Sequence, residues 1–299
     1  MKVLTITGDK KFVAGNLRFD LQSSHVERLV PIYWGSGSLW PSIPKEQFDV
    51  ITVQDPFWRG LFAWFIARKK RIRFNVQVHT DLSAQSFSRR MIARIVLSRA
   101  HSIRVVSEKI KKQVETIGVL APIYVLPVYI NVNLFRSLKR EPNEQKTILW
   151  IGRFEAEKDP VYAIDIFKKV RKTCVDTKLI MLGLGSLEET LRRRAKGSTV
   201  EFPGWVDVKL YLKIADVVLC TSRHESWGAS IVEALIAGVP VVAPDVGIAK
   251  EAGARVVPRE KLAEAIINVL KSDLKVIGKL QLHLIEDPKK WAEAWIKTL

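Results

Sequence analysis

The sequence predicts an α/β protein made of two doubly wound domains, and three observations support that prediction. The chain has 299 residues, about twice the ~150 residues that serve as a prior for one domain. Its hydrophobic fraction of 47% and charged fraction of 26% are typical of globular proteins and exclude disordered, collagenous and coiled-coil chains. Short strand-like segments alternate with longer amphipathic ones, as parallel βαβ units require.

The predicted strands form two groups with a polar segment between them. The first group covers residues 3–7, 49–53, 74–79, 102–106 and 123–127, and the second covers 147–152, 178–183, 199–202, 216–221 and 239–244. Residues 137–146 are polar, contain a proline and lack a hydrophobic period, which predicts a linker. We therefore expect two Rossmann-like domains, residues 1–143 and 144–285, facing each other across a cleft. Ligands of such sheets bind beyond the carboxyl ends of the strands.

The chain ends on a predicted amphipathic helix. Pro288 suits a first helical turn, and Trp291 and Trp295 follow at helical spacing. Because such a helix needs a surface to cover, we expect residues 286–299 to complete the N-terminal domain.

Positive charge is concentrated in the first half of the chain. The net charge is +17 overall, +13 over residues 1–143, +12 over residues 56–112 alone and +4 over residues 144–299. This asymmetry favours an anionic partner for the N-terminal domain, such as a phosphorylated substrate, an acidic membrane surface or nucleic acid. Ordinary solvated helix faces remain the alternative.

Other features indicate the compartment. No segment approaches the ~18 apolar residues of a membrane span, and the first residues do not read as a signal peptide. Cys174 and Cys220 have no ligand-like spacing, so neither a zinc site nor a disulfide framework is expected. These observations predict a reducing cytoplasm.

A pair of glutamates marks the most informative stretch. Glu225 and Glu233 follow a predicted strand, the first in a loop and the second in the helix after it. A carboxylate accepts two hydrogen bonds from a vicinal diol, and amide groups at a helix start bind phosphate. A nucleotide sugar carries both groups. A helix acid plus a capping interaction is the alternative for such a pair.

Two cations follow the first strand of the same domain. Arg153 and Lys158 lie in the loop before the helix predicted over 160–172. Two fixed cations would neutralise the charge that develops on a departing diphosphate. Solvated loop residues are the alternative.

Four motifs extend this pattern into a resemblance. They are WIGRFEAEK (150–158), IMLGLGSLEE (180–189), EFPGWV (201–206) and SRHESWGASIVEALIAGVPVVAPDVG (222–247). With them, residues 147–272 resemble the donor domain of the family 4 retaining glycosyltransferases, which have the two-domain GT-B architecture. The resemblance implies transfer of a sugar from a UDP- or GDP-sugar, as substrate, to an acceptor with retention of configuration. It implies no metal and no cofactor.

The resemblance also implies roles for individual residues. Catalytic roles fall to Arg153 and Lys158 at the diphosphate, Glu225 at the transferred sugar and His79 across the cleft. Glu233 would hold the ribose hydroxyls. The remaining implied donor contacts are Gly152, Ser226, Trp227, Gly228 and Ala229, together with the base-binding loop Gly204, Trp205 and Val206. The chain departs from the common Glu-Gly-Phe-Gly pattern at Ser226 and Trp227, which bears on the identity of the sugar more than on the nucleotide.

The N-terminal half offers weaker candidates. Gly15, Lys10, Lys11 and Arg18 surround the loop after the first strand and are predicted acceptor contacts. Residues 57–67 spread aromatic side chains widely around a helix and are followed by RKKRIR. That combination suits either an anionic membrane surface or a crossover helix buried between its neighbours.

The predicted function is therefore sugar transfer by a cytoplasmic enzyme, which either associates peripherally with the membrane or presents its basic region to solvent. The acceptor is a sugar, a glycolipid or a polyprenyl-linked compound, with an anionic membrane surface as a further partner. One alternative is a nucleotide-sugar epimerase or hydrolase of the same fold. The other is a non-catalytic basic protein that binds nucleic acid or membrane. The chain has no known nucleic-acid motif, so no nucleic-acid partner is expected.

Overall fold

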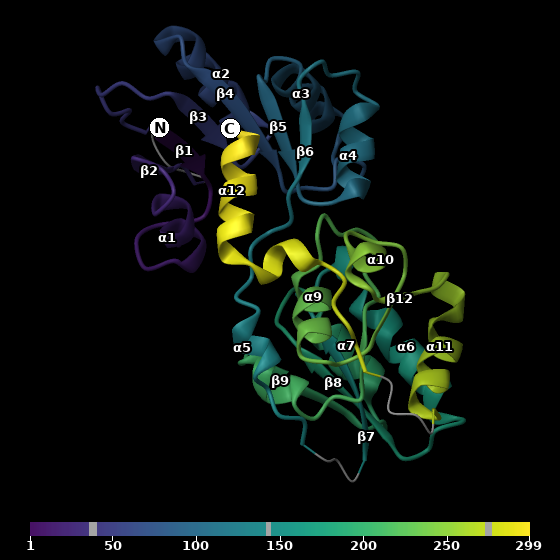
Figure 1. Ribbon diagram of the computed structural model, residues 1–299. Helices are drawn as coiled ribbons and strands as arrows, with labels where there is room; N and C mark the ends of the chain where they lie inside the picture. Colours follow the sequence, from purple (N-terminus) through teal and green to yellow (C-terminus); the bar gives the residue numbers. More distant parts are fainter. Residues whose placement is uncertain (36–40, 142–144, 273–276) are drawn as a thin grey trace. The chain divides into compact units, whose positions relative to one another are not determined.

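The computed structural model describes residues 1–35, 41–141, 145–272 and 277–299. The chain divides into two compact units (Figure 1). The first consists of Met1–Ile130 and Leu284–Leu299, and the second of Asn131–His283. Each unit contains one six-stranded sheet, and all of its strand pairs are parallel. The predicted α/β class with two doubly wound sheets is confirmed.

The sheet of the first unit has the order β2-β1-β3-β4-β5-β6. Its strands are β1 (Lys2–Thr7), β2 (Arg28–Tyr33), β3 (Val50–Val53), β4 (Arg73–Val78), β5 (Ser102–Val105) and β6 (Ile123–Val125). The strand order reverses between β1 and β3. Strand β2 was not predicted, because Pro31 interrupts its pattern; it lies at the sheet edge, where a strand tolerates proline.

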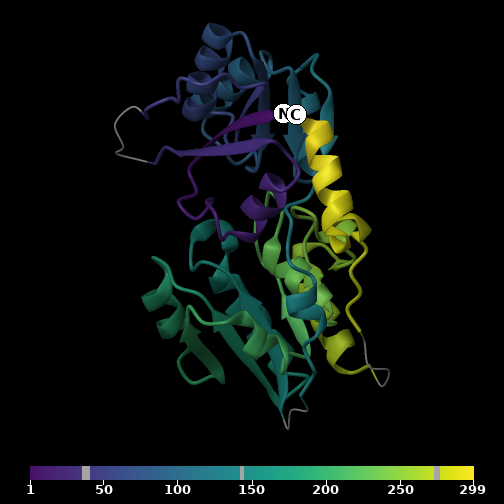
Figure 2. The same cartoon turned by 60° about the vertical axis from the view of Figure 1, so that its left-hand side comes forward.

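Helices cover both faces of this sheet. They are α1 (Leu17–Ser23), α2 (Trp58–Lys70), α3 (Phe87–Leu97), α4 (Glu108–Glu115) and α12 (Pro288–Thr298). Helices α2 and α3 pack against each other, and α12 packs against α1 and β5. Figure 2 shows the yellow C-terminal helix on the opposite face of the sheet from the blue helices.

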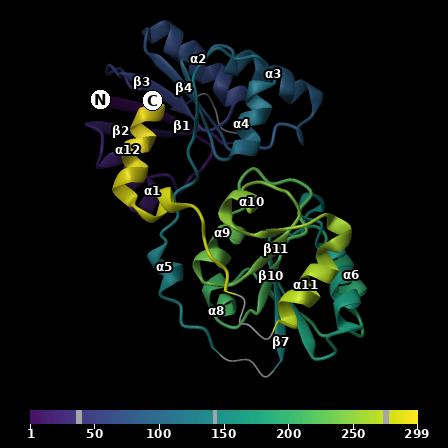
Figure 3. The same cartoon turned by 45° about the vertical axis from the view of Figure 1, so that its right-hand side comes forward.

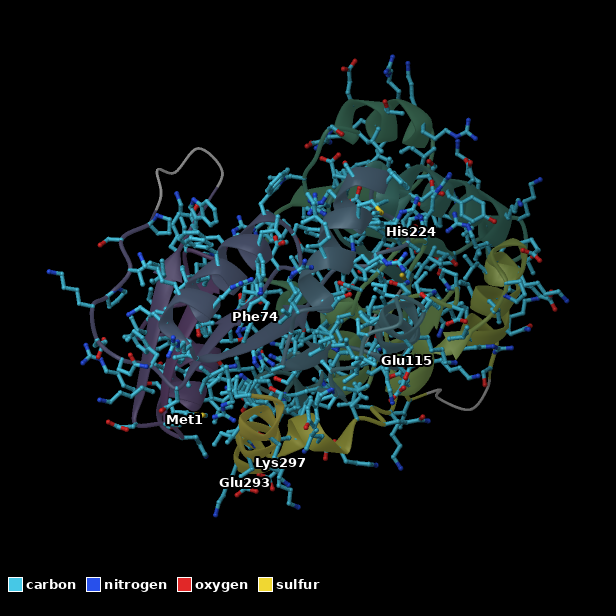
Figure 4. The ribbon with its side chains drawn as sticks, turned by 90° about the horizontal axis from the view of Figure 1, so that it is seen from above. Met1, Phe74, Glu115, His224, Glu293 and Lys297 are labelled. Carbon is cyan, nitrogen blue, oxygen red and sulfur yellow. The ribbon has the colours of Figure 1, made fainter. Side chains whose placement is uncertain are left out.

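Helix α12 rests on buried polar groups. The side chains of Asn75 and Ser102 both donate to the Thr298 carbonyl, each at 2.7 Å. The indole Nε1 of Trp291 donates to the Pro127 carbonyl at 2.9 Å. The outer face of the helix is charged, as Glu293 and Lys297 show in Figure 4. These bonds fix the C-terminal segment in the first unit.

The sheet of the second unit has the order β12-β11-β10-β7-β8-β9. Its strands are β7 (Lys146–Ile151), β8 (Thr177–Leu182), β9 (Val200–Gly204), β10 (Val217–Leu219), β11 (Val241–Ala243) and β12 (Arg255–Val256). The order reverses between β7 and β10. Such a reversal point is where open α/β sheets bind ligands.

The helices of the second unit enclose an apolar core. They are α5 (Asn133–Arg136), α6 (Pro160–Arg171), α7 (Glu188–Ala195), α8 (Val208–Leu212), α9 (Ala229–Ile236), α10 (Ala249–Ala252) and α11 (Leu262–Leu270), with short 3-10 turns at Ala156–Lys158, Arg259–Lys261 and His283–Glu286, the last of which extends into the first unit. Helices α6 and α11 lie side by side (Figure 3) and bury Trp150, Phe154 and Phe167. Helix α5 packs against α9, so the predicted boundary after residue 143 falls inside this unit rather than between the units.

Two features are absent from the described residues. No helix among them has the length and apolar character needed to cross a bilayer. No group of three or more histidine, cysteine, aspartate or glutamate side chains among them is arranged to hold a metal ion.

Candidate active site

A pocket of about 440 Å³ lies at the carboxyl edge of the second sheet, where the strand order reverses. It is built entirely from second-unit residues. The lining residues are Ile151, Gly152, Arg153, Lys158, Leu182, Gly183, Gly204, Trp205, Val206, Val208, Glu225, Ala229, Ser230 and Glu233. The structure therefore gathers the predicted cations, both predicted glutamates and the Gly204–Val206 loop around one cavity.

An ion pair joins the two sides of this pocket. Lys158 comes from the turn after β7, and its Nζ contacts Oε1 of Glu225, from the loop after β10. The hydroxyl of Ser222 donates to the same oxygen at 2.9 Å. The side chains of Lys158 and Glu225 are only 19% and 11% exposed. Their desolvation is offset by their attraction and by the Ser222 hydrogen bond, so the ammonium group is held in place.

A second layer of contacts fixes the backbone of Lys158. The Thr221 hydroxyl donates to the Lys158 carbonyl at 3.0 Å and accepts from the indole of Trp150 at 2.9 Å. Arg259 donates to the Asp159 carboxylate and to the Thr221 carbonyl, each at 2.6 Å. The loops after β7 and β10 are thereby tied to one guanidinium. Arg259 was not among the predicted site residues, because no local sequence pattern indicates its role.

Arg153 is held more loosely. It lines the same pocket, but its side chain is 63% exposed and pairs with Glu157 at 2.7 Å. An exposed pair of this kind contributes little energy and exchanges easily. The guanidinium can therefore turn toward an anion in the pocket at small cost.

Glu233 is the second partly buried carboxyl of the pocket. It lies on α9, and burial raises its pKa to about 6. The carboxylate form, which accepts two hydrogen bonds from a diol, therefore predominates above pH 6. Ser230 lies one turn earlier on the same face and also lines the pocket. It was missed, although the adjacent Ala229 was predicted.

Glycine is required at the base of the pocket. A Cβ on Gly183 would lie 1.8 Å from the Gly152 carbonyl oxygen, and Gly183 has φ +149°. The segment 183–185 is thus a tight strand-to-helix turn. At the rim, Trp205 is 74% exposed. Its ring offers a flat surface on which a nucleobase can stack.

Three predicted donor contacts do not line this pocket. Ser226, Trp227 and Gly228 lie in the loop between Glu225 and α9, outside the lining residues. Trp227 is 5% exposed, and its carbonyl accepts from the backbone of Ile248 at 2.9 Å. Its large apolar ring packs into the interior of the unit. Gly228 precedes α9 with φ +99°, a conformation that favours glycine.

His79 belongs to the first unit, just after β4. Its Nε2 lies 3.3 Å from Oε1 of Gln77. Burial lowers the pKa of His79 well below its ordinary value, and the charges of Arg104 and Arg18 lower it further. The imidazole is therefore neutral at physiological pH and can donate one hydrogen bond and accept another.

The acceptor candidates lie after β1, also in the first unit. Arg18 pairs with Asp9 at 3.4 Å, and burial lowers the pKa of its guanidinium. Lys10 lies over the Tyr33 ring, 5.4 Å from its centroid. Lys11 is exposed. Gly15 has φ +88°, and a Cβ there would meet no atom within 4 Å. The backbone at Gly15 is therefore open, and the cations of this loop remain predicted contacts.

Two family profiles match the chain. The family described as Glycosyl transferases group 1 matches residues 145–272, and the one described as Glycosyltransferase Family 4 matches residues 18–134. Among solved structures, HepE from Anabaena in complex with UDP and glucose aligns with a TM-score of 0.80 and 17% identity, covering 100% of this chain and 99% of HepE. At this identity the similarity establishes the fold.

Curated relatives match shorter parts of the chain. The 2-deoxystreptamine N-acetyl-D-glucosaminyltransferase of Niallia circulans is 31% identical over 117 residues, 37% of this chain and 30% of the relative. The alpha-monoglucosyldiacylglycerol synthase of Streptococcus pneumoniae is 25% identical over 228 residues, 66% of this chain and 52% of the relative. The chain thus spans about a third to a half of these relatives.

The two family matches follow each other along the chain, with residues 135–144 between them, and together they cover most of both units. The strand order, the pocket at the reversal point of the second sheet and the match to HepE agree with them. The chain therefore belongs to the family 4 glycosyltransferases, of the group 1 type, and has the GT-B fold.

Proposed function

We propose that this protein is a retaining glycosyltransferase that moves a sugar from a nucleotide diphosphate donor to an acceptor without a metal ion. One observation supports the proposal above all: Lys158, Arg153 and Glu233 line a single pocket, together with the first residues of α9. Cations suit the diphosphate, the helix start suits phosphate oxygens, and the carboxylate suits the ribose diol. The donor carries UDP or GDP, and UDP is the first candidate.

We infer the reaction steps from the roles proposed for these residues. The bond between the sugar C1 and the diphosphate oxygen breaks, and its electron pair leaves with the diphosphate. Lys158 and Arg153 stabilise the charge that develops there. The acceptor oxygen bonds to C1 on the same face, and its proton passes to the leaving phosphate oxygen. Glu225 binds hydroxyls of the transferred sugar. His79, a neutral imidazole of the first unit, stays a predicted sugar contact.

Thermal stabilisation by a panel of nucleotide sugars tests the donor. A ligand that binds only the folded protein raises the melting temperature by mass action. UDP-sugars, or failing them GDP-sugars, should raise it, while free sugars should not. No stabilisation by any nucleotide diphosphate would contradict the proposal.

Product analysis tests the reaction type against an epimerase or a hydrolase. Those enzymes would convert the donor at full rate without an acceptor, whereas a transferase would need one. The acceptor is a sugar, a glycolipid or a polyprenyl-linked compound. The relative from Streptococcus pneumoniae, named for a glucosyldiacylglycerol product, supports testing lipid acceptors first.

A further inference from the structure

The first unit contains a larger cavity of different character. An apolar groove of about 1010 Å³ runs along α2, and we call it the α2 groove. Its apolar wall includes Trp34, Ile43, Trp58, Leu61, Phe62 and Phe65. Lys45, Lys69 and Lys70 also line it. The groove plays no part in the pocket described above, which the second unit builds alone.

Two aromatic side chains of the groove face solvent. Trp58 is 68% exposed and Phe65 is 61% exposed. They are seven residues apart, which places both on the same face of α2. Large apolar side chains that stand together at a surface mark an interaction site. On the face of α2 that packs against the sheet, the side chains of Ala63, Ile66 and Ala67 are buried, as expected for a helix that covers a sheet.

The groove is preformed. Lys70 donates from Nζ to the carbonyls of Pro44 at 3.2 Å and Glu46 at 3.1 Å, which fixes the opposite wall to the end of α2. At the other end, Arg59 donates to the Trp34 carbonyl at 2.5 Å. The Trp34 ring packs on Phe62, with centroids 4.7 Å apart. A ligand would therefore enter without having to order its own site.

The rim of the groove is cationic. Lys45 and Lys69 are exposed and pair with no carboxylate in the part of the chain that the structure describes. The surrounding segment, residues 56–112, has a net charge of +12. An occupant with an apolar body and an anionic head matches both the wall and the rim.

The neighbouring helix repeats this combination. On α3, Phe87 is 72% exposed, Met91 42% and Ile95 39%, at four-residue spacing. Arg90 and Arg94 are exposed beside them. Because α2 and α3 pack against each other, the pattern extends over two adjacent helices. Exposed apolar side chains interleaved with cations characterise helices that lie in the interface of anionic bilayers.

We propose that the α2 groove takes the hydrocarbon chain of an anionic bilayer lipid, with Lys45 and Lys69 binding its phosphate, so that α2 and α3 dock on the membrane. The inference does not depend on the proposed sugar transfer. Helix α2 starts directly after the carboxyl end of β3, and Arg59 links that end to Trp34 and lies beside Gly8. Docking therefore brings the carboxyl edge of the first sheet close to the bilayer.

Vesicle sedimentation tests docking. Wild-type protein should bind vesicles that contain phosphatidylglycerol and not vesicles of phosphatidylcholine alone. The double variant Trp58→Ser/Phe65→Ser should bind at least about tenfold more weakly, since burial of two aromatic side chains is lost. The control Leu120→Ser removes a fully exposed leucine of the same unit and should bind like wild type. Equal binding by wild type and the double variant would overturn the proposal.

A soluble amphiphile separates chain capture from surface charge. Calorimetry should detect binding of decyl phosphate, below its micelle concentration, to wild type and not to Trp58→Ser/Phe65→Ser. Inorganic phosphate should bind neither protein. Binding of phosphate as tight as that of decyl phosphate, or no binding of decyl phosphate to wild type, would refute the hydrocarbon site. Circular dichroism and the thermal shift with nucleotide sugars should match wild type in both variants, so this outcome is independent of the proposed function.

Discussion

The two units bury different groups beneath similar sheets. In the second unit, α6, α7 and α11 close an apolar core around Trp150 and Phe154. In the first unit, Arg104 is fully buried, donates to Gln77 at 2.8 Å and stacks beneath Trp291 of the C-terminal helix. Burial lowers the pKa of Arg104 to about 9.

This difference shows two ways in which helices can be held against the face of a sheet. An apolar core is built from neighbouring helices and tolerates changes that conserve volume. A buried polar network needs every partner, and here several partners come from a helix more than 160 residues away in sequence, as the Trp291–Pro127 bond illustrates. The first unit should therefore depend on its distant C-terminal helix, whereas the donor pocket should not.

The largest effect is expected from Trp291→Ala. Loss of this fully buried indole and of its bond to Pro127 should lower the free energy of unfolding by ~3–5 kcal/mol. Urea denaturation measures the change. Trp58→Ala, at a 68% exposed position, is the control and should change stability little. Nucleotide-sugar affinity should persist while the variant is folded, because the pocket lies in the other unit; its loss in folded protein would contradict the comparison.

Lys158→Ala should weaken nucleotide-sugar binding by about 100-fold, or ~2.7 kcal/mol, because a fixed, partly buried cation is lost. Isothermal calorimetry with the stabilising donor measures this. Lys178→Ala removes a lysine of the same unit that pairs with Glu201 at 3.2 Å, outside the pocket, and should bind normally. Unchanged binding by Lys158→Ala would remove the main support for the proposed site.

Glu233 should make donor affinity and stability respond to pH in opposite ways. Its folded pKa of about 6 exceeds the usual 4.5. The folded state therefore binds the proton more tightly, and stability falls as pH rises from 4.5 through 6. Donor affinity should instead fall below pH 6, as the carboxylate is protonated.

Glu233→Gln tests both effects. At pH 7.5 the free energy of unfolding of the variant should be about 1–2 kcal/mol higher than that of wild type, because no carboxylate is desolvated. The variant should nevertheless bind the donor weakly. At pH 4 the stability difference should vanish. Glu201→Gln changes an exposed carboxyl and should show neither effect. Equal donor affinity of wild type at pH 5 and pH 7.5 would argue against the ribose contact.

The smallest effect is expected from Arg153→Ala. Since its guanidinium is 63% exposed, donor affinity should fall by about tenfold or less. Glu157→Gln frees Arg153 from its partner and should leave affinity unchanged or slightly higher. A loss as large as that of Lys158→Ala would show that the two cations act equally.

Local patterns predicted ten of the twelve strands that the structure describes, and the two glutamates, since strand period and a strand-loop-helix sequence are encoded by neighbouring residues. Local patterns failed to predict features that depend on contacts with residues distant in the sequence. Strand β2 is formed despite Pro31 because it lies at an edge, and Arg259 acquires its role only when Asp159 and Thr221 meet it. The domain boundary was misplaced because packing of α5 on α9 leaves no mark in the linker.

The site residues divide in the same way. The side chains of Lys158, Glu225 and Glu233 meet because strands of one sheet end together, which a sequence can indicate. Whether Trp227 enters the pocket or the interior depends on the space that the surrounding side chains leave. A sequence alone does not indicate that space.

The contact between Lys158 and Glu225 means that the pocket supplies a counter-ion for its own lysine. An anion that binds near Lys158 must compete with the Glu225 carboxylate. Because that carboxylate is part of the folded chain, it loses little entropy when it pairs with the lysine. A small anion with few further contacts competes poorly, while a larger molecule that also engages distant walls can displace it. We therefore expect this internal ion pair to favour a larger anion over free phosphate.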